Sequence, residues 1–192
     1  IVKNLGEAEA TIMLGVPLIF ESMYKRLWKK AEKEGRADKL KKGLMVNRAL
    51  RKVGMDKSKK LFKAIHQALG GHIRMFISGA AAIDPEIIEC FNDLGVNMFQ
   101  GYGLTECSPI VTVSKDRYMK AASAGLPMQG TEVKIFEPDE DGIGEIICRS
   151  DSVMLGYYED EEETKKVLRD GWFFTGDLGY FDNDGFLYIT GR

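Results

Sequence analysis

Two short apolar runs flank an amphipathic segment between residues 73 and 100, and this alternation constrains the fold more than any other feature. IRMFIS at residues 73–78 and VNMFQ at residues 96–100 have the composition of buried strands. Between them, Asp84 and Pro85 form a helix start, and the predicted helix buries Ile87, Ile88, Phe91 and Leu94 before it ends at Gly95. A strand–helix–strand unit of this kind predicts a parallel sheet covered by helices.

The segment before this unit predicts one more strand and two helices. ATIMLGVP is typical of a short buried strand that ends at Pro17, which suits the first position of a helix. Helical spacing then relates Phe20, Met23, Tyr24, Leu27, Trp28 and Ala31. A second amphipathic helix, closed by Gly70 and Gly71, is predicted from Leu61, Ile65, Ala68 and Leu69.

After Pro127 the pattern becomes mostly β. TEVKIFEPDEDGIGEIICR predicts two strands around an acidic Asp-Gly turn, and the aromatic C-terminal stretch predicts further strands separated by glycines. A short helix is expected from Asp160 to Arg169, with Asp160 and Glu163 as a capping box. The predicted fold class is therefore α/β, with an αβ portion at residues 1–127 and a mostly β subdomain at residues 128–192.

Composition places the chain among soluble globular proteins. Its 192 residues are 44% apolar and 29% charged, and they contain no apolar run of eighteen residues. The N-terminus has no signal-peptide pattern. Cys90, Cys107 and Cys148 are widely spaced without a CxxC motif, so neither a disulfide framework nor a zinc site is expected. A reducing cytoplasm is the expected location.

Charge is distributed unevenly along the chain. Residues 25–63 hold sixteen Lys or Arg and four Asp or Glu, a net charge of +12, whereas the rest carries −14. One interpretation is a solvated helical face, with basic side-chain stems covering apolar surface. A second is peripheral contact with anionic lipid, to which apolar contact is added by Leu44, Met45, Val46, Leu50 and Val53. Nucleic acid is not favoured, because no aromatic-interleaved binding motif accompanies the charge.

The stretch QGYGLTECSP, at residues 100–109, is the first candidate site. It fails as a dinucleotide fingerprint, because Glu106 replaces the third glycine and no helical period follows. The turns DEDG and DNDG do not place acids at the positions of a calcium loop, so hairpin turns are the better interpretation. His66 and His72 lack other ligands at suitable spacing and are expected at the surface or at a helix end.

Taken together, the glycine-rich turns suggest a nucleotide site. SGAAAI offers a backbone surface without bulky side chains, and Tyr102 offers a ring, so a purine could stack between them. Thr105 supplies a hydroxyl, and Glu106 supplies a hard carboxylate suited to Mg²⁺. Asp177, in the later TGD turn, could accept hydrogen bonds from both ribose hydroxyls.

These motifs resemble the adenylate-forming superfamily, which includes acyl-CoA synthetases, luciferase and the adenylation domains of peptide synthetases. The resemblance rests on SGAAAI, QGYGLTE, GEIICRSDSVMLGYY and GWFFTGDLGYFDNDGFLYITGR in this order. GVPLIFESMYKRLWKK and the basic insertion at about 25–70 are most similar to a bacterial-type long-chain fatty acid–CoA ligase. The resemblance implies a layered αβ large domain followed by a distorted β-barrel subdomain.

The resemblance also implies a reaction: a fatty acid attacks ATP to give an acyl-adenylate and pyrophosphate, and coenzyme A then releases AMP. Thr105 and Glu106 would be catalytic, with Thr105 on phosphate and Glu106 on Mg²⁺. Gly101 and Gly103 would leave room for the acyl carbon. Cys107 is set aside as a nucleophile, since the family uses none. Nucleotide-binding roles are implied for Gly79, Ala80, Ala81, Gln100, Gly101, Tyr102, Gly103, Leu104, Thr105, Asp177, Ile189 and Arg192.

The resemblance further implies segments that these residues do not contain, namely an upstream phosphate loop with its lysine and a lid with a lysine beyond Arg192. We therefore expect an internal fragment of the large domain that is inactive alone and self-associates through an exposed edge or apolar face. The alternatives are an adenylate-forming enzyme for an aryl or amino acid, or a non-catalytic module that binds nucleotide or lipid.

Overall fold

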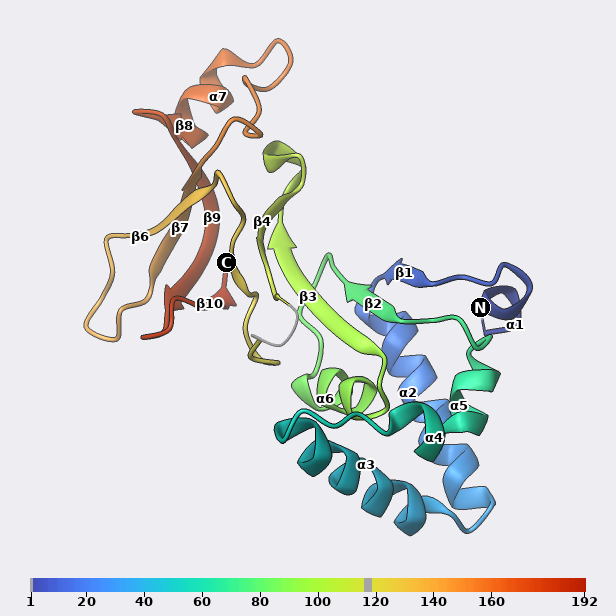
Figure 1. Cartoon of the computed structure of the whole chain (residues 1–192). Helices are drawn as coiled ribbons and strands as arrows, with labels where there is room; N and C mark the ends of the chain where they lie inside the picture. Colours follow the sequence, from blue (N-terminus) through green and yellow to red (C-terminus); the bar gives the residue numbers. More distant parts are fainter. Residues whose placement is uncertain (1, 116–118) are drawn as a thin grey trace. The chain divides into compact units, whose positions relative to one another are not determined.

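The structure, a computed structural model, describes residues 2–115 and 119–192. The chain divides into two compact units, Ile1–Phe99 and Gln100–Arg192. The mixture of helices and sheets confirms the predicted α/β class (Figure 1). The boundary predicted at residue 127 follows the change from αβ to β character along the chain, and it stays a prediction.

The first unit contains the predicted strand–helix–strand order. β1 (Ile12–Gly15) pairs in parallel with β2 (Met75–Ser78), and β3 (Asn97–Gly103) begins beside β2. α6 (Pro85–Asp93) connects β2 to β3, and the Asp84 side chain caps it by accepting a hydrogen bond from the Glu86 amide at 2.8 Å. The strand and helix assignments of this region are thereby confirmed.

The apolar faces of helices α2 and α6 pack against β2. α2 (Pro17–Lys33) begins at Pro17, as predicted, and α1 (Val2–Glu7) precedes β1. Phe76 on β2 lies between the other two elements, with ring centroids 5.2 Å from Phe20 on α2 and 5.1 Å from Phe91 on α6. Phe20 and Phe76 have no exposed surface, so these rings form the centre of the unit's core.

The basic stretch forms three further helices. These are α3 (Ala37–Lys52), α4 (Ser58–Leu61) and α5 (Lys63–Ala68), so the single helix predicted around Leu61–Leu69 is interrupted at Phe62. Asn47 on α3 is fully buried and donates a hydrogen bond to the Asp93 carbonyl at 2.8 Å. Arg48 pairs with the Asp93 carboxylate at 2.6 Å, which attaches α3 to the end of α6. No helix within the described residues is long and apolar enough to cross a membrane.

An apolar surface is exposed where β1 leads into α2. Leu14 is 72% exposed and Leu18 is 69% exposed, and Ile12 and Val16 are also exposed. β1 is the last strand on its side of the sheet. The strand predicted from ATIMLGVP is present, but it is exposed at the sheet edge and is not the buried strand that the sequence predicts. The exposed edge and apolar face agree with the expectation from the sequence, while self-association through them stays a prediction.

The second unit is built from antiparallel strands. The end of β3 pairs with β4 (Ile110–Val113), which pairs with β5 (Leu126–Pro127). A second sheet has the order β10-β9-β7-β6, formed by β6 (Glu132–Phe136), β7 (Gly144–Arg149), β9 (Trp172–Phe181) and β10 (Leu187–Gly191). β8 (Leu168–Arg169) also pairs with β9. The mostly β character expected after Pro127 is confirmed.

The turns and the helix of this unit follow their local sequence. DEDG connects β6 to β7 and DNDG connects β9 to β10, so both are hairpin turns as predicted. α7 (Glu161–Val167) is capped by Asp160, whose side chain accepts a hydrogen bond from the Glu163 amide at 2.9 Å. That bond is the Asp160 half of the predicted capping box.

Candidate functional site

Gly79, Ala80 and Ala81 follow β2 in the first unit and form an irregular turn. Ala80 has a φ of 74°, a conformation that favours glycine, and it is exposed together with Ala81. The hydroxyl of Ser78, immediately before the turn, is buried without a hydrogen-bond partner in the described structure. Backbone outliers and unpaired buried hydroxyls occur at functional sites. The nucleotide-binding role of Gly79, Ala80 and Ala81 stays a prediction.

The GYG segment lies at the end of β3, where the chain passes close to β4. A Cβ atom at Gly103 would lie 1.7 Å from the Pro109 carbonyl oxygen, and one at Gly101 would lie 2.8 Å from the Thr112 carbonyl oxygen. Both glycines are therefore required by the close approach of two strands. β3 leads into the 3₁₀ turn η1 (Thr105–Cys107), which has no place in a dinucleotide fingerprint.

Tyr102, Asp177 and Arg192 form one cluster in the second unit, which we call the Asp177 cluster. The Tyr102 hydroxyl donates to Asp177 Oδ2 at 2.7 Å, and Arg192 Nε lies 3.4 Å from Asp177 Oδ1. Burial and the neighbouring Asp177 raise the pKa of Tyr102, so its hydroxyl remains a donor at neutral pH. The cluster presents a carboxylate held from both sides, with Arg192 exposed beside it.

The Tyr102 ring is largely enclosed. It is 9% exposed and belongs to a hydrophobic cluster with Cys107, Val111, Ile146 and Leu187, among others. The hydrogen bond to Asp177 gives the residue a role that sequence reasoning did not anticipate, because residues 102 and 177 are far apart in the chain. Stacking of Tyr102 on a base stays a prediction.

Glu106 lies on η1 and is half-buried, and Thr105 beside it is exposed. The Tyr157 hydroxyl donates to Glu106 Oε1 at 2.9 Å, and the Met154 amide donates to the Glu106 carbonyl at 2.7 Å. Burial and the Glu106 carboxylate raise the pKa of Tyr157. The segment MLGYY therefore orients Glu106 from both its main chain and its side chain, although the sequence assigned Tyr157 no role.

Glu106 is the carboxylate that the sequence predicts as a metal ligand. The described residues contain no group of three or more His, Cys, Asp or Glu side chains placed to hold a metal ion. Mg²⁺ is commonly held by one or two carboxylates together with substrate phosphates and water. Glu106 accepts the Tyr157 hydroxyl through Oε1, and Oε2 fits a role of this kind.

Cys107 is adjacent to Glu106 but turns into the core. Its Sγ lies 3.5 Å from Sγ of Cys148, and both side chains are buried. The hydrogen bond with Cys148 and burial raise the pKa of the Cys107 thiol. A buried thiol with a raised pKa is a poor nucleophile, which agrees with setting Cys107 aside.

Comparison with known proteins identifies the family. The profile described as AMP-binding enzyme matches residues 1–158. The chain belongs to the AMP-binding enzyme family. It is 33% identical to the long-chain-fatty-acid–CoA ligase ACSBG2 of Gallus gallus and 31% identical to FadD15, a long-chain-fatty-acid–CoA ligase of Mycobacterium bovis. Both alignments cover 100% of this chain but only 27% and 34% of those relatives.

Solved structures of AMP-binding enzymes share the fold. The o-succinylbenzoate CoA synthetase of Bacillus subtilis, in complex with its acyl-adenylate intermediate, aligns with a TM-score of 0.69 and 25% identity. That alignment covers 100% of this chain and 33% of the synthetase. MatB of Rhodopseudomonas palustris aligns with a TM-score of 0.69 and 26% identity, over 98% of this chain and 32% of MatB. The resemblance to adenylate-forming enzymes expected from the motifs is confirmed.

The remaining residues predicted to bind nucleotide, Gln100, Leu104 and Ile189, lie in the second unit. Gln100 is buried on β3 and uses its side-chain amide to bind main-chain carbonyls of the segment that precedes β5. Leu104 packs against the hydrophobic cluster of Tyr102. Ile189 lies at an irregularity of the β9–β10 pairing and is 44% exposed. Their roles toward a nucleotide stay predictions.

Proposed function

We propose that the protein containing this chain activates a fatty acid with ATP to an acyl-adenylate and then transfers the acyl group to coenzyme A. Membership of the AMP-binding enzyme family supports the adenylation step. The names of curated relatives, which are long-chain-fatty-acid–CoA ligases, favour a long-chain acid. The chain spans about a third of the length of these two relatives, so the proposal concerns the product of the complete reading frame.

The observation that carries the proposal is the Asp177 cluster. Asp177 accepts a hydrogen bond from Tyr102 through one oxygen and lies beside Arg192 through the other. A carboxylate fixed in this way is a strong acceptor for the two hydroxyls of a ribose. In this proposal Arg192 and Ile189 border the ribose. The contact with adenine that the sequence predicts for Gly79, Ala80 and Ala81 stays a prediction.

In this proposal Thr105 would contact the reacting phosphates directly, and Glu106 would act on them through a bound metal ion. A magnesium ion bound with ATP would supply positive charge that offsets the charge on the phosphates. Glu106 would hold that ion through Oε2, with Tyr157 keeping its carboxylate oriented. The exposed hydroxyl of Thr105 would donate to a phosphate oxygen. These contributions are positioning and electrostatics, and they need no protein nucleophile.

Pyrophosphate release from ATP tests the proposal. The product of the complete reading frame is assayed with Mg²⁺, coenzyme A and a panel of acids from C2 to C18, and the largest kcat/KM is expected with long chains. Glu106→Gln should lower kcat by about 100-fold, because one charged contact to the metal is lost. Preference for an aryl acid would instead favour the alternative suggested by the o-succinylbenzoate CoA synthetase among the structural relatives. The 192-residue chain alone should release none.

We also propose peripheral contact of this protein with anionic membrane. Around α3, Met45, Val46, Val53 and Met55 are exposed, whereas Leu44, which the sequence placed among the lipid-contacting residues, is buried and Leu50 is half-buried. Exposed lysines lie near them along the chain, namely Lys41, Lys42, Lys52, Lys57, Lys59 and Lys60. Apolar side chains among clustered lysines favour the interface of an anionic bilayer. A long-chain acid substrate is itself concentrated in membranes, so this contact would bring the enzyme to its substrate.

Vesicle flotation tests the membrane proposal. We expect stronger binding to vesicles of phosphatidylcholine with phosphatidylserine than to phosphatidylcholine alone. Lys42→Glu with Lys52→Glu should weaken that binding at least tenfold, since each lysine contributes about 1 kcal/mol near anionic lipid. Lys29→Glu with Lys33→Glu makes the same charge change on α2 and should weaken it less. Equal binding of the unmodified protein to both vesicles would refute the electrostatic contact.

A further inference from the structure

The segment of residues 120–125, which we call the clamp segment, contacts three strands of the second unit. The Gln100 side chain on β3 donates to the carbonyls of Ala121 and Ser123 at 2.8 and 2.9 Å. The Thr112 hydroxyl on β4 donates to the Ala124 carbonyl at 2.8 Å. On β10, Leu187 exchanges two main-chain hydrogen bonds with the clamp segment, one with Ala124 and one with Gly125. The clamp segment therefore joins the strand of Tyr102 to the sheet of Asp177.

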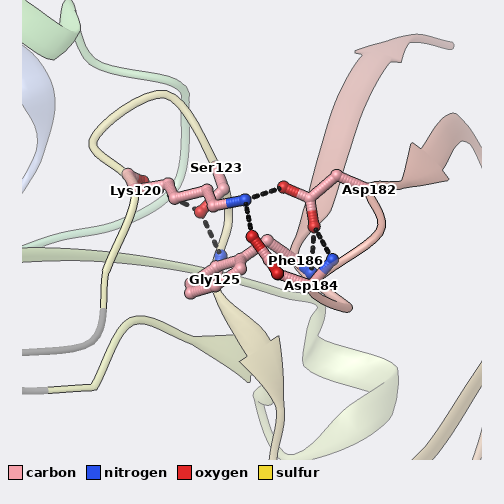
Figure 2. A network of polar contacts seen from close by, with 6 residues as sticks. All are labelled: Lys120, Ser123, Gly125, Asp182, Asp184 and Phe186. Atoms are coloured by element: carbon pink, nitrogen blue, oxygen red, sulfur yellow. Dashed lines mark hydrogen bonds and ion pairs between the residues drawn. The ribbon is translucent and has the colours of Figure 1, made fainter.

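Lys120 attaches the first residue of the clamp segment to the turn between β9 and β10. Its Nζ lies 2.6 Å from Asp182 Oδ2 and 2.6 Å from Asp184 Oδ2 (Figure 2). The ammonium also lies 5.0 Å from the centre of the Phe186 ring. One lysine thus connects to both carboxylates of the DNDG turn and to the aromatic side chain that follows it.

The turn that Lys120 contacts is itself ordered. Asp182 Oδ1 accepts hydrogen bonds from the amides of Asp184 and Phe186, at 2.9 and 3.0 Å, while Oδ2 faces Lys120. Lys120 and these amides lower the pKa of Asp182, which keeps its carboxylate ionised. The ion pair therefore contacts an ordered turn that connects the end of β9 to the start of β10.

Both ends of this connection lead to the Asp177 cluster. β9 carries Asp177 five residues before Asp182, and β10 leads from Leu187 toward Arg192. Gln100, which binds the clamp segment, lies two residues before Tyr102 on β3. The 2.7 Å hydrogen bond from Tyr102 to Asp177 requires these strands to keep a fixed separation.

We propose that Lys120 is a positioning residue for nucleotide binding, because its ion pairs with Asp182 and Asp184 hold Asp177 on β9 in place against Tyr102 on β3. The inference rests on the proposed function, in which Asp177 receives the ribose. The DNDG turn would then help to align the site, in addition to connecting β9 and β10 as a hairpin. Lys120 acts through Asp182, Asp184 and the strands, without touching substrate.

The test measures Kd for ATP and for 2′,3′-dideoxy-ATP in the product of the complete reading frame. Lys120→Met should weaken ATP binding about fivefold and dideoxy-ATP binding less than twofold, because only ATP has the ribose hydroxyls that Asp177 receives. KM for the fatty acid should stay within about twofold. Lys120→Arg should restore ATP binding, and Lys115→Met, an exposed lysine five residues earlier, should match the unmodified protein.

Three results separate the possibilities. An equal loss of affinity for ATP and dideoxy-ATP in Lys120→Met, or no loss for either, overturns the positioning role. An unmodified protein that releases no pyrophosphate from ATP with any acid overturns the proposed function instead. Asp184→Asn serves where Lys120→Met does not fold, because Asp184 is 57% exposed and its loss leaves the Lys120–Asp182 pair in place. It should show the same selective loss for ATP at a smaller size, and an unselective loss again counts against positioning.

Discussion

Two carboxylates in the second unit each accept a hydrogen bond from a tyrosine, yet their surroundings differ. Asp177 is 16% exposed, and its partner Tyr102 is 9% exposed. Glu106 is half-buried, and its partner Tyr157 is 36% exposed. Asp177 also has Arg192 beside its second oxygen, whereas Tyr157 binds Glu106 through Oε1, which leaves Oε2 for a further ligand.

The difference indicates how one pair of residue types can serve two tasks. A carboxylate enclosed by a tyrosine and an arginine is fixed in place and suits a substrate group that needs a rigid acceptor. A carboxylate held by one accessible tyrosine keeps an open coordination position, as a magnesium ligand shared with phosphates requires. The comparison predicts that Asp177 variants alter nucleotide affinity and that Tyr157 variants alter the requirement for metal.

Replacing Asp177 should have the largest effect. Asp177→Asn removes the charge that faces Arg192 and weakens the hydrogen bonds that residue 177 accepts from the ribose hydroxyls. The free energy of ATP binding should become less favourable by about 2 kcal/mol. KM for ATP should therefore rise about 30-fold, and KM for the fatty acid should change little. Steady-state kinetics with each substrate varied in turn measures both values.

Asp151→Asn is the matched control for this prediction. Asp151 is an exposed aspartate of the same unit, so the same charge change there should leave both KM values unaltered. A proportional rise of KM for ATP and for the fatty acid in Asp177→Asn would contradict a ribose-specific role.

Replacing Tyr157 should have a smaller effect, and it should appear only in the dependence of activity on Mg²⁺ concentration. Tyr157→Phe removes the hydrogen bond to Glu106 and should raise the Mg²⁺ concentration for half-maximal activity about threefold. The rate at saturating Mg²⁺ should be retained, because the carboxylate itself remains. Titration of pyrophosphate release with Mg²⁺ at saturating ATP measures the shift.

Tyr158→Phe provides the control for Tyr157, since Tyr158 is the next residue and is 90% exposed. It should reproduce the Mg²⁺ titration of the unmodified protein. A Tyr157→Phe variant with an unchanged Mg²⁺ requirement and a lower maximal rate would indicate that Tyr157 supports the loop and does not orient Glu106.

The sequence predicted both carboxylates and also Tyr102 and Arg192 as site residues, but it predicted neither the Tyr102–Asp177 contact nor the role of Tyr157. Local signals identified the strands, the cap at Asp84 and the turn that carries Glu106, because capping, glycine turns and apolar periodicity act over a few residues. The Tyr102–Asp177 and Lys120–Asp182 contacts join residues 75 and 62 positions apart. No local pattern encodes such contacts, since they depend on how the strands pair. The break at Phe62 was missed for a related reason: the apolar period continues through a turn.

The smallest effect concerns the dependence of stability on pH. The pKa of Tyr102 is raised in the folded state, so its contribution to stability is complete below the ordinary tyrosine pKa near 10 and is lost as pH rises through the raised value. Tyr102→Phe should thus lower the free energy of unfolding by about 1 kcal/mol at pH 8. The difference in free energy of unfolding between this variant and the unmodified protein should shrink above about pH 10. Tyr157→Phe should show a smaller difference at both pH values, because Tyr157 is more exposed. Urea unfolding of the three proteins at pH 8 and 10.5 measures these differences, and equal curves for Tyr102→Phe and Tyr157→Phe would remove the distinction between the buried and the exposed pair.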